Sequence, residues 1–230
     1  MHSDSSIAPP AGSGIIECGE GLAGNLSAQY RARMTPIKDL AQLGKQIAAQ
    51  HGWAAAKAFK TYEMDDSDRA TLSQCALDLL KVFPPMPGAC ALMSASLAGT
   101  LERRMTAPIQ VIAGTLAVDR EPVFGNRKPF DGPAVFAASN PDWDGHVWVM
   151  VGPYVVDVSL FRTAYSRHGP VRLAKHIDLA FGPNKGLYVD RWKRTAQLGL
   201  SYEPQSVLSA DEVTRLMGGA FHLIKQSQSG

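Results

Sequence analysis

Residues 145–159 read GHVWVMVGPYVVDVS, and this stretch decides the fold. Apolar runs on both sides of Gly152-Pro153 predict two antiparallel strands, His146–Val151 and Tyr154–Val158, which a tight turn would join. Strands that are this apolar are typical of a buried sheet. A histidine and an aspartate within them therefore need partners, because buried polar groups that lack hydrogen bonds are costly.

The spacing of this histidine and aspartate predicts that they pair. If the turn has an even number of residues, Val151 faces Tyr154 and Trp148 faces Asp157, so His146 and Asp157 are diagonal neighbours on one face. A carboxylate on one imidazole nitrogen fixes the tautomer and leaves the other nitrogen free to accept a thiol proton. An odd-numbered turn would place the two side chains on opposite faces. The alternative interpretation is a satisfied structural pair.

Cys90 is the candidate partner for this pair. The prolines of segment 84–88 end one helix, and the apolar pattern predicts another over Cys90–Met105. Unpaired N–H groups and the dipole at a helix start stabilise a thiolate there. Gly88 lets the backbone turn sharply into that helix. The alternative is that Cys90 is a small core residue, since free cysteines are often buried and inert.

Taken together, segments 88–101, 109–118, 145–151 and 154–159 resemble the core of the transglutaminase-like superfamily of cysteine enzymes. That core has Gly-x-Cys opening a helix, then a strand, then a strand with histidine and a strand with aspartate. The resemblance implies an α+β, papain-like fold, in which N-terminal helices pack on an antiparallel β-sheet. It covers residues 86 to 160, about a third of the chain.

The resemblance also implies roles for three residues: Cys90 as nucleophile, His146 as base and Asp157 as orienting acid. The stretch from Cys90 to His146 is longer than in compact members because of a Pro/Gly/Asn/Asp-rich loop at 119–144. Such a loop shapes or covers a substrate cleft, so the substrate class cannot be carried over from the family.

Further site residues are expected around this triad. Trp143 and Trp148 flank His146 and are candidates for substrate binding, although core packing explains Trp148 equally well. Backbone amides at the Cys90 helix start are the expected oxyanion donors, with Gln74 and Gln110 as side-chain candidates.

Helices and tails extend outward from the core. Residues 1–24 are expected to form a flexible tail, and residues 25–230 a single domain. The first helix outside the core is expected to start at Thr35-Pro36 and run to Gln50, and a further helical piece to cover Trp53–Lys60. A second helix is expected after Asp66-Ser67-Asp68. A last helix is expected to open at Ser209, with Glu212 completing a capping box.

Composition bounds the protein class. The chain has 230 residues with 45% hydrophobic and 19% charged residues, which is typical of one globular domain. A net charge of +2 gives no reason to expect a nucleic-acid or membrane partner. Its three cysteines (Cys18, Cys75 and Cys90) are few and odd in number, and no signal-peptide pattern or spanning apolar run stands out. These features predict a cytoplasmic protein that needs no cofactor or metal; they leave open export without an N-terminal signal, and the oligomeric state.

These residues favour thiol-dependent acyl chemistry on an amide, with a cysteine protease or amidase acting on a protein or peptide as the leading hypothesis. Transamidation and glutamine deamidation begin with the same two steps, in which Cys90 attacks the amide and a thioester forms. An arylamine N-acetyltransferase-like enzyme is a second hypothesis, because residues 154–158 resemble its aspartate strand. Pro87-Gly88-Ala89, however, stands where those enzymes usually carry Arg-Gly-Gly. The third hypothesis is a non-catalytic binding module on the same fold.

Overall fold

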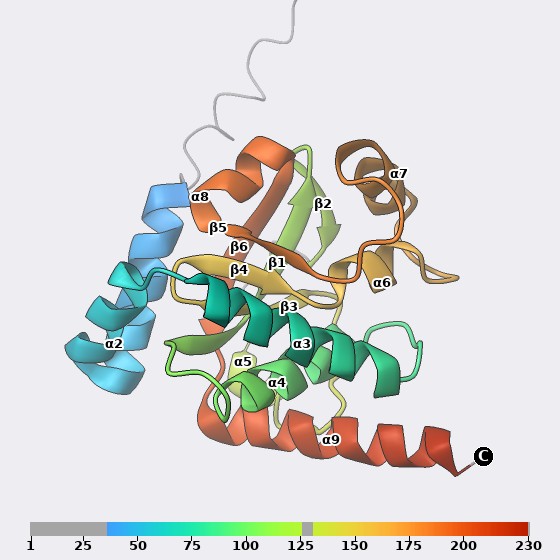
Figure 1. Ribbon diagram of the computed structural model, residues 1–230, viewed down its shortest axis with the longest axis horizontal. Helices are drawn as coiled ribbons and strands as arrows, with labels where there is room; N and C mark the ends of the chain where they lie inside the picture. The colour runs from blue at the N-terminus through green and yellow to red at the C-terminus, as the bar shows by residue number, and fades with distance from the viewer. Residues whose placement is uncertain (1–35, 126–130, 230) are drawn as a thin grey trace, which may run out of the picture. The chain divides into compact units, whose positions relative to one another are not determined.

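The computed structural model describes residues 36–125 and 131–229, and the chain from Thr35 onward forms one compact unit. The tail predicted at 1–24, the domain start predicted at residue 25, Cys18 and the N-cap Thr35 lie outside the described residues. Helices and strands follow in this order: α2 (Pro36–Thr61), α3 (Asp66–Val82), α4 (Cys90–Leu101), β1 (Ile109–Val118), β2 (Glu121–Phe124), α5 (Gly132–Val135), β3 (His146–Val151), β4 (Tyr154–Asp157), α6 (Leu160–Ala164), α7 (Val171–Ala180), β5 (Tyr188–Arg191), α8 (Trp192–Thr195), the 3-10 turn η1 (Ala196–Leu198), β6 (Leu200–Val207) and α9 (Ala210–Gln228) (Figure 1).

The strands form one six-stranded antiparallel sheet around β1. One edge of β1 pairs with β6 over Ile112–Val118. The other edge is shared, because β3 pairs with its first half up to Gly114 and β2 pairs with its last residues, 116–118. Strands β4 and β5 continue the sheet beyond β3. Helices around an antiparallel sheet make this an α+β fold, as the sequence predicts.

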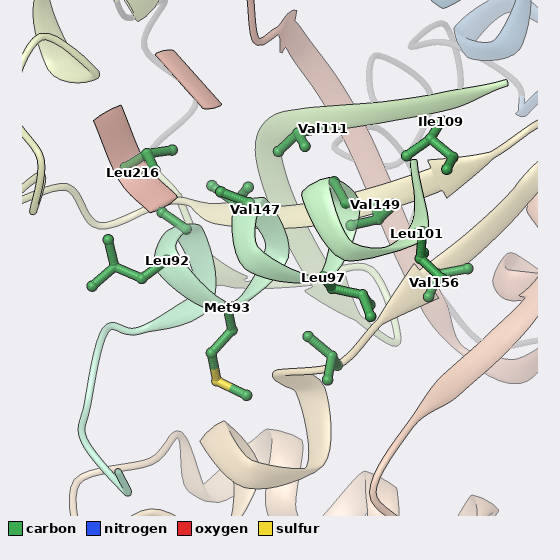
Figure 2. Packing of buried hydrophobic residues seen from close by; sticks show 14 of the residues in the cluster. Leu92, Met93, Leu97, Leu101, Ile109, Val111, Val147, Val149, Val156 and Leu216 are labelled. Atoms are coloured by element: carbon green, nitrogen blue, oxygen red, sulfur yellow. The ribbon is translucent and has the colours of Figure 1, made fainter. Parts of the chain in front are cut away.

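Side chains of the central strands alternate between two hydrophobic cores. Val147 and Val149 point to the face covered by α3, α4 and α9, where α4 packs over β3 and β4 (Figure 2). Trp148 and Met150 point to the opposite face, whose core includes residues of α2, α7 and α8 (Figure 1). Burial on both faces explains why these strands are apolar at almost every position.

The predicted helix starts are confirmed at Cys90 and Ser209, whereas α3 begins at Asp66, within the segment that was predicted to precede it. The helix α2 bends at Gly52, whose φ of 83° is non-helical, so the two expected helical pieces are present. Capping boxes open α3 at Asp65 and α9 at Ser209, with Glu212 completing the second. The helix that begins at Cys90 ends at Leu101, four residues before the predicted end, because the chain leaves the helix in a turn there.

The prediction of one long loop over 119–144 is wrong in part, since this stretch contains β2 and α5. Asp119 and Arg120, with φ of 50° and 71°, make a two-residue hairpin turn between β1 and β2. Glycine or asparagine usually occupies such positions, so Asp-Arg gave no turn signal in the sequence. The remaining part of this stretch includes residues 126–130, which lie outside the described residues.

Two adjacent glycines of α9 provide a test of its packing. Added to Gly218, a Cβ would meet nothing within 4 Å, whereas at Gly219 it would lie 1.9 Å from the carbonyl oxygen of Ser139. We expect Gly218→Ala to raise the free energy of unfolding by about 0.5–1 kcal/mol, because alanine favours a helix. Gly219→Ala should lower it by about 1–3 kcal/mol through overpacking. Urea denaturation of both variants would measure this, and equal effects would contradict the placement of α9.

Candidate functional site

Cys90 is the first residue of α4. Gly88 turns the chain into this helix with a φ of 71°, as its position in the sequence suggests. The N-cap residue is Ala89, and no side chain among the described residues caps this helix end. Its first amides are therefore available to an anion at the position of the thiol. Cys90 is half-buried, in contrast to the fully buried Cys75.

His146 and Asp157 form the predicted pair. Strands β3 and β4 pair Val151 with Tyr154 across the turn, as expected. The Nε2 atom of His146 lies 2.6 Å from Oδ2 of Asp157, and the two side chains are 1% and 0% exposed. Because an ionised carboxylate can only accept hydrogen bonds, Nε2 carries a proton and donates a hydrogen bond to Oδ2. The other ring nitrogen, Nδ1, is thereby left to interact with Cys90.

Asp157 is surrounded by hydrogen-bond donors. Its Oδ1 accepts from the N–H and hydroxyl of Ser159 at 3.0 and 2.9 Å, and from the N–H of Leu160 at 2.9 Å. Its Oδ2 also accepts from the hydroxyl of Tyr202 at 3.1 Å. Burial alone would raise the pKa of Asp157, but the charge of His146 and these hydrogen bonds lower it. The carboxylate is therefore held ionised.

The imidazole of His146 is correspondingly held in its charged form. Burial opposes the charge, but the carboxylate of Asp157 and, to a smaller extent, the nearby sulfur of Cys90 raise the pKa of His146 above its usual 6.5. Phe124 lies nearly parallel to the imidazole at a centroid distance of 5.2 Å. This contact follows from the sheet, because β2 and β3 share one edge of β1 and meet where His146 begins its strand.

A buried hydrogen bond fixes α4 beside the start of β3. The hydroxyl of Ser94 donates to the carbonyl oxygen of Val147 at 2.9 Å, and Ser94 is fully buried. Ser94 stands one helical turn after Cys90, and Val147 follows His146 directly. This contact therefore brings the first turn of α4 to the strand end that carries the imidazole.

The two tryptophans differ in placement. Trp148 is 0% exposed in the core, where it packs against Trp192 and Tyr202, so its expected contact with substrate is wrong for this arrangement. Its large ring fills the face of the sheet beneath His146. Trp143 is half-buried and makes an edge contact with Phe136 at a centroid distance of 5.5 Å.

Neither glutamine is placed as an oxyanion donor. Gln74 is exposed, and its amide donates to Asp78 at 2.8 Å on the solvent side of α3. Gln110 pairs with Met150, four positions along β1 from the residue opposite His146, which is about 13 Å away along a strand. Backbone amides at the start of α4 are the donors that remain from the sequence prediction.

Sequence reasoning missed two residues of the site. Tyr202, in β6, reaches Asp157 only because β6 pairs with the far edge of β1. Phe124 reaches His146 through β2, a strand that the sequence did not reveal. Ser159 stands two residues after Asp157, a spacing that fits a side chain closing a local turn on that aspartate.

The chain was compared with protein-family models, curated proteins and solved structures, and no match was found in any of the three. The site is therefore interpreted from its own geometry. Within residues 36–125 and 131–229, no cluster of three or more His, Cys, Asp or Glu side chains could hold a metal ion. Helices in the same ranges are too short or too polar to cross a bilayer.

Proposed function

We propose that this protein is a cysteine hydrolase or acyltransferase of the transglutaminase-like type, with a papain-like arrangement of Cys90, His146 and Asp157. The observation that carries the proposal is a buried His146–Asp157 hydrogen bond of 2.6 Å whose imidazole also interacts with Cys90 at the start of α4. A purely structural His–Asp pair would not require a half-buried thiol on the second ring nitrogen.

The proposed reaction begins from an ion pair, in which Nδ1 of His146 already holds the proton that the Cys90 thiol has given up. The thiolate attacks the amide carbon, and the carbonyl oxygen becomes an oxyanion that accepts from backbone N–H groups of α4. The imidazolium then gives its proton to the amide nitrogen as the C–N bond breaks, which leaves a thioester on Cys90. Water, or an amine in a transfer reaction, loses a proton to His146 and attacks the thioester. The C–S bond then breaks, which releases the acid or the new amide and restores the thiolate of Cys90 beside the imidazolium of His146. Asp157 holds the imidazole throughout.

Hydrolysis of a protein or peptide amide is the proposed outcome. A pocket of about 580 Å³ lies beside the loop that leads into Cys90, and this volume is large enough for side chains of a peptide. Transamidation and deamidation of glutamine would use the same thioester and differ only in the group that attacks it.

A screen of fluorogenic peptide amides, with acid quenching and intact mass measurement of trapped acyl-enzyme, tests the proposal. We expect Cys90→Ala to lower the turnover of any active amide by about 10⁴-fold or more, because no thioester can form. Cys75→Ala, which removes the buried cysteine, is the matched control and should leave turnover unchanged. Full activity in Cys90→Ala would contradict the proposal.

The same mass measurement separates amide hydrolysis from acetyl transfer. Incubation with acetyl-CoA is expected to leave Cys90 unmodified. An acetyl group on Cys90 would instead identify the donor as a CoA thioester and reject an amide as the first substrate.

A further inference from the structure

A pocket of about 580 Å³ adjoins two segments of the proposed catalytic site. One wall is formed by Pro85, Met86 and Pro87, and Pro87 precedes Cys90 by three residues, at most about 11 Å of chain. Another wall begins at Phe161, four residues after Asp157. The pocket therefore lies within a few peptide residues of the thiol.

The charged groups that line this pocket all carry positive charge. They are Arg162, Arg167 and Lys185, and the lining contains neither aspartate nor glutamate. Within the described part of the chain, none of the three forms an ion pair with a carboxylate. Arg162 is fixed instead by donating to the carbonyl oxygens of Phe83 and Leu80, at 2.7 and 2.8 Å. Its guanidinium is therefore held in a fixed position by carbonyl oxygens at the end of α3, and it has no carboxylate partner within the described residues.

The rest of the lining is largely apolar. Met86 and Phe161 contribute to it, and Tyr165 lies at its surface with 48% of its side chain exposed. The hydroxyl of Tyr165 donates to Asp178, which is outside the lining. Two prolines restrict the backbone of the wall nearest Cys90, so this wall is formed before any ligand arrives.

We propose that this pocket selects the substrate: it binds an acidic peptide segment, in which an aspartate or glutamate lies next to an apolar residue. Carboxylates would pair with Arg162, Arg167 and Lys185, and the apolar side chain would contact Met86, Phe161 and Tyr165. An extended chain advances about 3.3–3.6 Å per residue, so a peptide bound against the Pro87 wall can reach Cys90 with about three residues or fewer. This inference rests on the proposed function, because it assigns the pocket to the substrate of Cys90.

Fluorescence anisotropy with two labelled peptides tests the inference in Cys90→Ala protein, so that binding does not depend on chemistry. One probe is a glutamate-rich peptide with a single phenylalanine, and the other carries lysine at each glutamate position. We expect the acidic probe to bind at least about tenfold more tightly, with an affinity that falls as salt is added.

Charge reversal at the exposed rim locates the binding. The double variant Arg167→Glu/Lys185→Glu should weaken binding of the acidic probe by about tenfold or more. The matched control Lys57→Glu/Lys60→Glu makes the same charge change at exposed positions of α2 and should alter binding by less than about twofold. Equal binding of the two probes, or equal effects of the two double variants, would overturn the inference.

Alkylation of Cys90 in the wild-type chain tests whether a peptide bound in the pocket also covers the thiol. The acidic probe should slow its modification by iodoacetamide, and the lysine probe should not. Selective binding to Cys90→Ala protein without protection of the wild-type thiol would retain an acidic-peptide pocket but reject its link to Cys90. Turnover of amides without any preference for acidic peptides would reject the pocket assignment and leave the proposed function intact.

Discussion

In the His146→Ala variant, the rate of Cys90 alkylation by iodoacetamide is expected to fall by more than about a hundredfold between pH 8.5 and pH 6. In the wild-type chain, the imidazolium held by Asp157 stabilises the thiolate, so the alkylation rate should vary only a few-fold over this range. Without it, the thiolate fraction should follow that of a free cysteine, which titrates near 8.5 and falls about tenfold per pH unit below it. Peptide mapping by mass spectrometry would report Cys90 separately from the buried Cys75.

Two further variants make this measurement specific. His176 also contacts a carboxylate, with Nδ1 3.3 Å from Asp119, but it lies on α7 away from the site, so His176→Ala should keep the wild-type pH profile. His146→Gln preserves more of the packing beneath Phe124 and should show the same loss as His146→Ala. A thiol that reacts only after unfolding, or a wild-type profile with a midpoint near 8.5, would contradict an activated nucleophile.

Asp157→Ala is expected to lower the free energy of unfolding by about 3–5 kcal/mol near pH 6. The substitution leaves the buried His146 without its counter-charge. It also removes the acceptor for Ser159, Leu160 and Tyr202. A loss of this size is a large part of the total stability of a domain. Asp157→Asn keeps the volume and one acceptor oxygen, so we expect a loss of about 2 kcal/mol in a chain that still folds.

The stability effect of Asp157→Asn should depend on pH, because two pKa values shift in opposite directions. The pKa of Asp157 is lowered, so its stabilising contribution is present above the usual 3.8 and is lost as the pH falls through the folded-state value. The pKa of His146 is raised, so its contribution is fully present below 6.5 and is lost as the pH rises through the folded-state value. The difference from wild type should therefore be largest between pH 3.8 and 6.5.

Urea denaturation of wild type and Asp157→Asn at several pH values would measure the difference in the free energy of unfolding across this pH range. Asp178→Asn is the matched control, because Asp178 also accepts from a tyrosine hydroxyl but is exposed. Its effect should stay within about 0.5 kcal/mol at every pH. A difference for Asp157→Asn that does not change with pH would reject the charged pair.

The hairpin and the helix that follows Gly88 were predictable from local chemistry. Gly152-Pro153 closes a tight turn, and the period of two along each strand then sets His146 and Asp157 on one face. The prolines before Gly88 similarly fix where the preceding helix ends and where α4 begins. Both results depend on residues that are neighbours in the chain.

The contacts made by distant segments were not predictable. Trp148 and Trp143 stand close to His146 in the sequence, yet only Trp143 keeps an exposed part, because Trp192 and Tyr202 from distant segments cover Trp148. Gln74 had the right chemistry for an oxyanion donor but lies on the exposed side of α3. Which side chains of a helix come near the site depends on contacts with distant segments, and no local sequence pattern predicts these contacts.

Local sequence patterns were sufficient to predict the residue types of the site, the two strands that carry His146 and Asp157, and the helix that starts at Cys90. Tertiary packing was needed to show that β6 brings Tyr202 to Asp157, that β2 covers His146 with Phe124, and that a pocket with three basic residues lies beside the loop before Cys90. The physical reason is the range of the forces involved. Turns, caps and strand alternation act over a few residues, whereas sheet order and pocket walls come from hydrophobic burial, which joins segments regardless of their separation in the chain.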